Sequence, residues 1–224
     1  MATFEVERLE GCQWIKATLR DETVRTERGA LNHMRGDLKM DMPLPSPREA
    51  FISLFSVESM FRPRFRGTGE IYLESSLGGF YSLQVTEGEP WIVEDGAYWA
   101  SEQGIRLSFH RERVVAALWA GEGLFWYQSK VSGSGQVVLA TSGDVEEVVL
   151  NDEQLTTEGR YVLARTAGLR LDVRRPARGL LGYFYSGESR MRVYHGTGRL
   201  LLSATPNWRL RMAQNAAAGV FKYL

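Results

Sequence analysis

The chain has 224 residues, 44% of them hydrophobic and 24% charged, with 23 glycines and seven prolines, a composition that excludes disordered and collagen-like proteins. The formal net charge of zero hides a segregation, because residues 160–224 hold twelve Lys/Arg against two acidic residues and carry +10, which leaves −10 on residues 1–159. The single cysteine, Cys12, excludes an internal disulfide and a cysteine-based metal cage.

The start of the chain carries no targeting signal that we recognise. Residues 1–10 are acidic and lack the basic and apolar regions of a signal peptide. No window approaches the roughly 18 uninterrupted apolar residues of a membrane-spanning helix. We therefore expect a soluble, cytoplasmic protein without a transmembrane segment.

The first third of the chain combines a glycine turn with an irregular connection. Gly29 is expected to form a turn between two strands. Three prolines between residues 43 and 47 mark a turn-rich connection. Ser46 and Glu49 form a capping box there, which predicts a short helix over residues 48–55.

The same landmarks return twice along the chain. A Gly-Ser/Thr-Gly pattern occurs at residues 67–69, 133–135 and 196–198, starting 38, 37 and 37 residues after Gly29, Gly96 and Gly159. A shorter Glu-Ser or Glu-Gly pair lies between them each time. Each glycine is expected to supply a positive φ at a turn between strands. These structural turn glycines are Gly29, Gly67, Gly69, Gly96, Gly133, Gly135, Gly159, Gly196 and Gly198.

Strand patterns follow the glycine landmarks. Residues 137–140 form an apolar β-prone run, and residues 169–174 alternate between apolar and charged side chains, which is typical of a strand with one buried face. Residues 114–120 fit a helix or a strand. The end of the chain, residues 212–224, fits a short helix or a final strand with a tail.

These repeats predict an all-β protein of three similar units: residues 1–76, 77–142 and 143–224, the last including a C-terminal tail. Units of about 64 residues are marginal on their own. We therefore expect them to share a continuous core or to pack around a pseudo-threefold axis in one compact body.

The turn and strand residues also carry a family resemblance. The stretch Gly121-Glu122-Gly123-Leu124-Phe125 leading to Gly133, its counterparts at residues 58–61 and 187–189, and Glu94-Asp95-Gly96-Ala97 resemble the family named for altered inheritance of mitochondria, number twenty-four. The resemblance covers almost the whole chain. It implies three shortened double-stranded β-helix units similar to that of the trp RNA-binding attenuation protein (TRAP), and it brings no catalytic residue set.

Candidate catalytic and metal-binding residues are few. His33, His110 and His195 occupy unrelated places in their units, and no His-x-His pair exists, so we expect neither a metal nor a cofactor. Nothing around Cys12 resembles a catalytic elbow. The Gly-Ser/Thr-Gly elements lack the further Gly-Lys-Ser/Thr of a phosphate-binding loop. No catalytic residue is assigned, and we expect a protein that is not an enzyme.

The basic third unit is the clearest functional signal. Its arginines recur at spacings of two or four with apolar residues on the opposite phase, which predicts an arginine-lined strand face. Such a face attracts phosphates, and Tyr183, Tyr185 and Tyr194 could stack on bases. The same arginines could instead balance the acidic first 159 residues, within the molecule or between subunits, and this structural reading is preferred. The candidate polyanion or partner contacts are Arg170, Arg174, Arg190, Arg192, Arg209 and Arg211.

The main hypothesis is therefore a non-enzymatic scaffold or interaction protein that forms a homo-oligomer, or binds a protein partner, through opposed acidic and basic parts. The alternative is binding of single-stranded RNA or another polyanion through the arginine face. A barrel enzyme with a site between units is least favoured, because no convergent polar constellation is visible.

Overall fold

The computed structural model describes residues 2–43, 62–76, 78–112, 127–158, 161–174 and 191–206. Over these ranges the protein is all-β, as expected, with fourteen strands in two seven-stranded antiparallel sheets. None of the described residues belongs to a helix that could cross a membrane. The helix expected at residues 48–55 and the ambiguous segments 114–120 and 212–224 lie outside the described residues.

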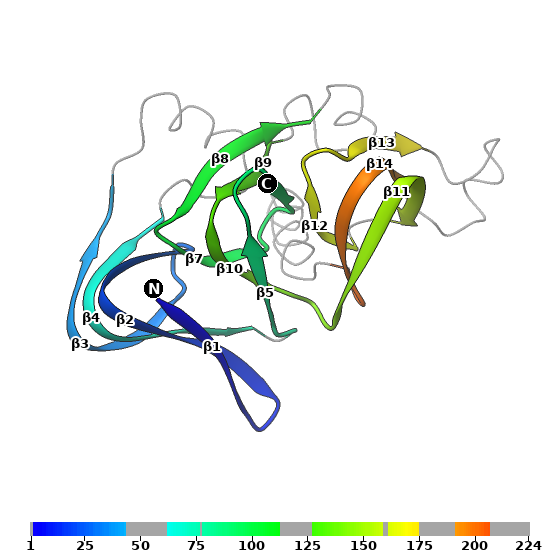
Figure 1. Ribbon diagram of the computed structural model, residues 1–224. Coiled ribbons are helices and arrows are strands. Elements are labelled where there is room, and N and C mark those ends of the chain that lie inside the picture. Colours follow the sequence, from blue (N-terminus) through cyan, green and yellow to red (C-terminus); the bar gives the residue numbers. More distant parts are fainter. Residues whose placement is uncertain are drawn as a thin grey trace, which may run out of the picture.

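Sheet A contains the N-terminal strands and part of the middle of the chain. Its strand order is β3-β4-β2-β7-β10-β5, and β1 pairs with β2 as a hairpin (Figure 1). The strands are β1 (Thr3–Leu9), β2 (Cys12–Thr26), β3 (Leu31–Asp41), β4 (Arg64–Ser76), β5 (Phe80–Val85), β7 (Tyr98–Glu102) and β10 (Gly135–Ala140).

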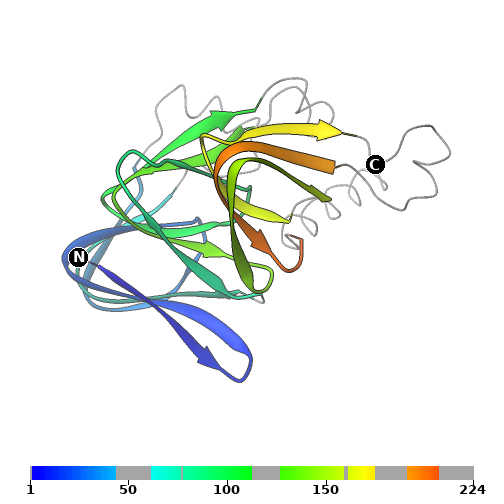
Figure 2. The ribbon, with the colours of Figure 1, turned by 45° about the vertical axis from the view of Figure 1, so that its right-hand side comes forward.

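Sheet B contains the rest of the middle of the chain and the C-terminal strands. Its order is β11-β14-β12-β6-β9-β8, and β13 pairs with β14 (Figure 2). The strands are β6 (Trp91–Val93), β8 (Ile105–Arg111), β9 (Tyr127–Gly133), β11 (Val145–Glu158), β12 (Val162–Thr166), β13 (Arg170–Arg174) and β14 (Met191–Ser203).

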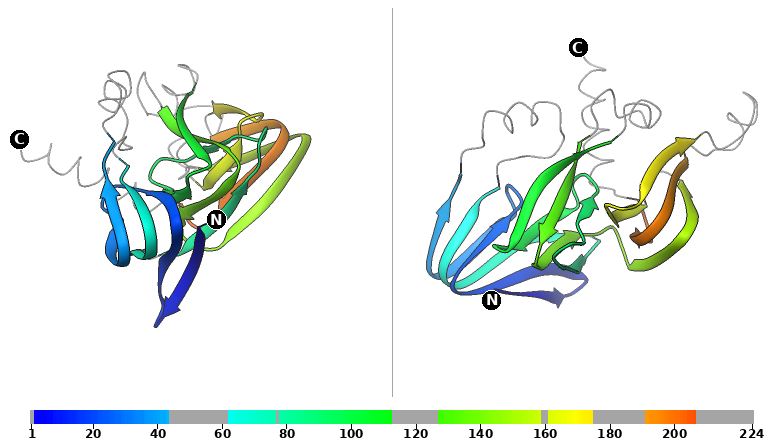
Figure 3. Two further views of the ribbon diagram at one scale, coloured as in Figure 1. Left: turned by 60° about the vertical axis from the view of Figure 1, so that its left-hand side comes forward. Right: turned by 45° about the horizontal axis from the view of Figure 1, so that its top comes forward.

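The middle of the chain joins the two sheets. Its strands alternate between them, since β5, β7 and β10 belong to sheet A and β6, β8 and β9 to sheet B. In Figures 1 and 3 the strands form three groups in a row, with β1–β4 at one end, the middle strands between, and β11–β14 at the other end. The outermost strands of the two sheets at these ends are β3 and β11.

Two of the three Gly-Ser/Thr-Gly elements lie inside strands and not in the expected turns, whereas Gly133 and Gly135 flank a bend between β9 and β10. Gly159 lies outside the described residues. Gly67 and Gly69 lie inside β4, with φ of +134° and +156°, and residues 196–198 lie inside β14. A Cβ on Gly67 would overlap the carbonyl oxygen of Asp37 on β3. Gly67 and Gly69 are therefore needed because the backbones of β3 and β4 approach each other closely, not because the chain reverses there.

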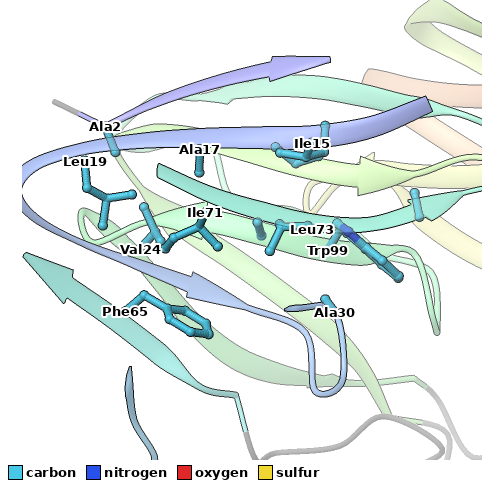
Figure 4. Packing of buried hydrophobic residues seen from close by; sticks show 13 residues of the cluster. Ala2, Ile15, Ala17, Leu19, Val24, Ala30, Phe65, Ile71, Leu73 and Trp99 are labelled. Carbon is cyan, nitrogen blue, oxygen red and sulfur yellow. The ribbon is translucent and has the colours of Figure 1, made fainter. Parts of the chain in front are cut away.

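The core of sheet A lies on the concave side of its bent strands. Alternate residues of β2 are buried, as period two requires, including Ile15, Ala17 and Leu19. Figure 4 shows these side chains packed with Phe65 and Trp99. Full burial of the larger of these side chains, such as Ile15 and Leu19, stabilises the fold by about 1.5–3 kcal/mol each. A second core cluster joins strands of both sheets, which makes the two sheets one folded body.

Candidate interaction surface

A short strand contact joins the N-terminal strands to the middle of the chain. The end of β2 pairs with β7 over three residues, and the next residue, Glu27, donates its N–H to the carbonyl oxygen of Trp99 at 2.7 Å. We call this the first strand contact. Its pairs are Val24–Glu102, Arg25–Ser101 and Thr26–Ala100.

A second strand contact joins the middle of the chain to the C-terminal strands in the same way. The whole of β6 pairs with β12, and the next residue, Glu94, donates its N–H to the carbonyl oxygen of Leu163 at 2.9 Å. Its pairs are Trp91–Thr166, Ile92–Arg165 and Val93–Ala164. Apart from the half-buried Arg25 and Glu27, every residue of the two contacts is buried. The chain thus uses one kind of strand contact twice.

An arginine forms an ion pair with the glutamate that ends the first strand contact. Arg62 Nε lies 3.3 Å from Glu27 Oε2, and its Nη2 donates to Ser129 Oγ on β9 at 3.0 Å. The guanidinium also lies 4.1 Å from the ring centroid of Tyr98. Arg62 therefore ties sheet A to sheet B through an ion pair, a hydrogen bond and a cation–π contact.

The glutamate that ends the second contact lies in a more deeply buried pair. Glu94 Oε2 accepts hydrogen bonds from Arg192 Nη1 on β14 at 3.0 Å and from Gln128 Nε2 on β9 at 2.7 Å. The side chains of Glu94 and Arg192 are only 4% and 5% exposed. Burial works to lower the pKa of Arg192, but the Glu94 carboxylate outweighs it and raises that pKa above its usual value. Arg192 therefore stays positively charged at neutral pH.

Another buried ion pair joins Arg165 on β12 to Glu112, the residue that follows β8. Arg165 binds Glu112 through Nη2 and donates through Nη1 to the carbonyl oxygen of Leu169 at 2.6 Å. Burial favours a higher pKa for Glu112, but hydrogen bonding from His110 and the charge of Arg165 hold it below its ordinary value. A carboxyl with a lowered pKa contributes stability above its unfolded-state pKa and loses it on acidification. This pair therefore stabilises the protein at neutral pH.

Most of the described arginines of the basic third segment are used inside the chain. Arg165 and Arg192 form the buried pairs just described, and Arg199 binds Glu89 and Glu147. All four of these glutamates belong to the acidic residues 1–159. These three arginines therefore balance the acidic first part of the chain, as the preferred interpretation of the charge segregation expected, and they link the oppositely charged parts of one molecule.

The arginine face expected from the sequence is not continuous. Arg170 and Arg174 are exposed on β13, but Arg192 lies on the buried side of β14, because its cross-strand partner is Val173 and not either arginine. Tyr194, expected to stack on bases, is 1% exposed. Arg190, Arg209, Arg211, Tyr183 and Tyr185 lie outside the described residues.

The two outer edges are strands β3 and β11, and most of their residues are exposed. Within the described residues β3 pairs only with β4, and β11 only with β14. Among the described residues, the six exposed large hydrophobic side chains include Met34 and Met40 on β3 and Val149 on β11. Strand β11 carries five carboxylates and no Lys or Arg. An exposed apolar edge strand is a template for pairing with another chain, so we take these edges as the candidate site.

The remaining candidate residues do not converge. No group of three or more His, Cys, Asp or Glu side chains in the described ranges could hold a metal ion. Cys12 is exposed in the β1–β2 hairpin. His33 stacks on Tyr72, and His195 Nε2 lies 2.8 Å from Asp172. These histidines therefore sit in local surface contacts.

Sequence reasoning missed the buried residues Glu94 and Gln128. The sequence did contain a signal for Glu94. A glutamate lies one or two residues before each of Gly29, Gly96 and Gly159, namely Glu27, Glu94 and Glu158. The turn prediction explained the glycine and left the glutamate unused. The structure shows that Glu27 binds Arg62 and that Glu94 links the end of β6 to β9 and β14 within sheet B.

Comparison with known proteins identifies a family and a fold. Residues 4–205 match the profile of the family described as mitochondrial biogenesis AIM24. Among solved structures, a crystal structure of a Streptococcus pyogenes protein is similar with a TM-score of 0.72 and 18% identity, covering 100% of both chains. No curated protein sequence matches this chain. The structural likeness supports the fold alone, and the family match confirms the resemblance seen in the sequence.

Proposed function

Since this chain belongs to the AIM24 family of mitochondrial biogenesis proteins, a match that extends over residues 4–205, we propose that it is a non-enzymatic scaffold that associates with copies of itself. The observation that carries the proposal is the pair of exposed outer edges, β3 and β11, one of them strongly acidic. Its buried ionisable groups support the same view, because Glu94, Glu112, Arg165 and Arg192 are engaged in ion pairs that join strands.

We also propose that the body consists of three TRAP-like units that share a continuous core. The strand pairings support this. In each unit, a strand that carries the Gly-Ser/Thr-Gly element lies between a strand that precedes Gly29, Gly96 or Gly159 and a strand that follows that glycine. Thus β4 lies between β2 and β3, and β14 pairs with β11 as well as with β12 and β13. In the middle unit the same role falls to β9 and β10.

Light scattering tests the proposed self-association. The chain mass is 25.3 kDa, and we expect a native particle of at least twice this mass. Because the association would join acidic β11 to a basic part of another copy, it should weaken between about 0.01 M and about 1 M salt, as the screening length falls from about 30 Å to about 3 Å. A monomer at high concentration, with a thermal stability that does not respond to salt, would contradict the proposal.

Polyanion binding is the second candidate function, and exposed Arg170 and Arg174 favour it. Both lie on one face of β13, and Asp172 between them is held by His195. The double variant Arg170→Glu/Arg174→Glu should weaken binding to heparin or single-stranded RNA about tenfold at low salt, since the contacts are with phosphates or sulfates. Affinity chromatography at stepped salt measures this loss.

The control for that experiment is Arg106→Glu, which reverses a charge on the exposed side chain of β8. It should change the elution salt much less than the double variant. Failure of the unmodified protein to bind at low salt, or an equal effect of the control, would exclude this candidate.

A further inference from the structure

We infer that the partner of the outer edges is a second copy of this chain, bound head to tail by the strand contact that the molecule already uses twice. Residues 155–157 of β11 in one copy would pair with residues 33–35 of β3 in the next. This inference rests on the proposed self-association and specifies its geometry. Three features of the molecule support it: β11 matches β2, β3 matches β7, and both edges are exposed whereas the internal contacts are buried.

Strand β11 reproduces the local structure of β2. Asp21 and Asp152 both have a positive φ, +54° and +57°, and their N–H groups donate to the Thr68 and Thr197 hydroxyls at 3.0 and 3.1 Å. The residue after each aspartate pairs with the first glycine of the neighbouring Gly-Thr-Gly.

This match continues to the residues that make the first strand contact. Val24 pairs with Phe65, two residues before Gly67, and Leu155 pairs with Tyr194, two residues before Gly196. Residues 155, 156 and 157 therefore occupy the places of residues 24, 25 and 26. In β2 these residues bind β7, whereas in β11 they form the outer edge of sheet B.

Strand β3 reproduces the other side of the contact. His33, Ala100 and Ala164 each pair with the residue three places after the second glycine of a Gly-Ser/Thr-Gly element, namely Tyr72, Val138 and Leu201. Ala100 and Ala164 are the residues that meet Thr26 and Val93 in the two internal contacts. His33 is therefore the position that should meet Thr157, with Met34 against Thr156 and Arg35 against Leu155.

The backbone direction in β2 shows which residue of the edge faces outward. Thr26 donates its N–H to the carbonyl oxygen of Pro63, on the side of β4, so the neighbouring Arg25 presents its backbone groups to β7. Thr156 occupies the place of Arg25. Its N–H and C=O therefore point away from β14, toward the position that a neighbouring copy would take.

Burial and charge agree with this pairing. The internal contact residues Ala100 and Ala164 are 0% and 1% exposed, but Met34 on the outer edge is 41% exposed. Pairing would cover this methionine. It would also bring Arg35 against β11, which carries five carboxylates. Because the two surfaces are different, the contact is heterologous, and it gives a closed ring or an open chain of copies.

A cross-linking experiment tests the register. Thr156→Cys and Met34→Cys are prepared as separate proteins, each also carrying Cys12→Ser, and are mixed under mild oxidation. Paired residues that face each other across two strands have Cα atoms about 5.5 Å apart, which a disulfide can bridge. We expect a covalent dimer from the mixture, in several-fold excess over either protein alone.

Met40→Cys is the matched control, since Met40 is an exposed methionine on the same strand but outside the proposed pairing. Mixed with Thr156→Cys, it should give little dimer. Equal cross-linking of Met34→Cys and Met40→Cys, in a protein whose native mass shows association, would reject this contact while leaving self-association in place. A monomeric native mass would reject both.

A second variant tests the contact without oxidation. Thr156→Pro removes the N–H that points outward, which an edge strand tolerates because the lost donor is not used within the sheet. The variant should stay folded by circular dichroism and lose its association in light scattering. A folded variant with an unchanged native mass would contradict the inference.

Discussion

Replacing Glu94 by glutamine is expected to lower the free energy of unfolding by about 3–5 kcal/mol, the usual effect of removing one partner of a buried ion pair. Arg192 loses the anion to which its Nη1 is bound at 3.0 Å, and its guanidinium stays positively charged because an arginine does not deprotonate in proteins. Both side chains are almost completely buried, so water cannot take the place of the carboxylate. Urea unfolding of the two proteins measures the difference.

Glu87→Gln is the control for this variant. It removes the carboxylate of an ion pair of similar length, 2.7 Å to Arg106, whose side chains are 68% and 67% exposed. Exposed pairs contribute little, so the loss should be several-fold smaller. The double variant Glu94→Leu/Arg192→Met should recover stability relative to Glu94→Gln, because it removes both charges. Equal losses for Glu94→Gln and Glu87→Gln would contradict a stabilising role for the buried pair.

Gly67→Ala is expected to destabilise the protein by at least about 2–3 kcal/mol. The backbone there has a φ of +134°, which L side chains rarely adopt, and the new Cβ would overlap the carbonyl oxygen of Asp37. The obstacle is backbone of the paired strand β3, so it cannot rotate away as a side chain would. Thermal unfolding should show a clearly lower Tm.

Gly11→Ala separates the two causes. Gly11 also has a positive φ, +83°, but no atom lies within 4 Å of the position of its Cβ. This variant therefore suffers backbone strain without overlap and should lose much less stability. Should Gly67→Ala unfold at the temperature of Gly11→Ala, the close approach of β3 and β4 would not explain the glycine.

The strands themselves could be predicted from the sequence, because alternation of apolar and polar residues depends only on local spacing. Residues 169–174 were expected to form a strand and contain β13, and the apolar run at residues 137–140 lies in β10. The family could be recognised as well, since its landmarks are short local patterns. The roles of the glycines were harder, because a positive φ inside a bent strand and one in a turn need the same residue.

The arginine face shows where local patterns failed. Alternation in the sequence placed Arg192 with Arg170 and Arg174, yet which phase of a strand faces the core depends on what packs there. On β14 the inner phase meets Glu94, a residue 98 positions earlier in the chain. A charge can be buried only when an opposite charge is brought to it, and spacing along one strand does not report that.

By itself, the sequence determined that this chain folds into strands, that its turns and bends recur in step, that its charges are divided between two parts, and to which family it belongs. The tertiary structure decided how those charges are used, which strand edges are paired inside the molecule and which face outward. The reason is physical: strand formation follows from neighbouring residues, but burial and edge pairing depend on segments that meet only after the chain has folded.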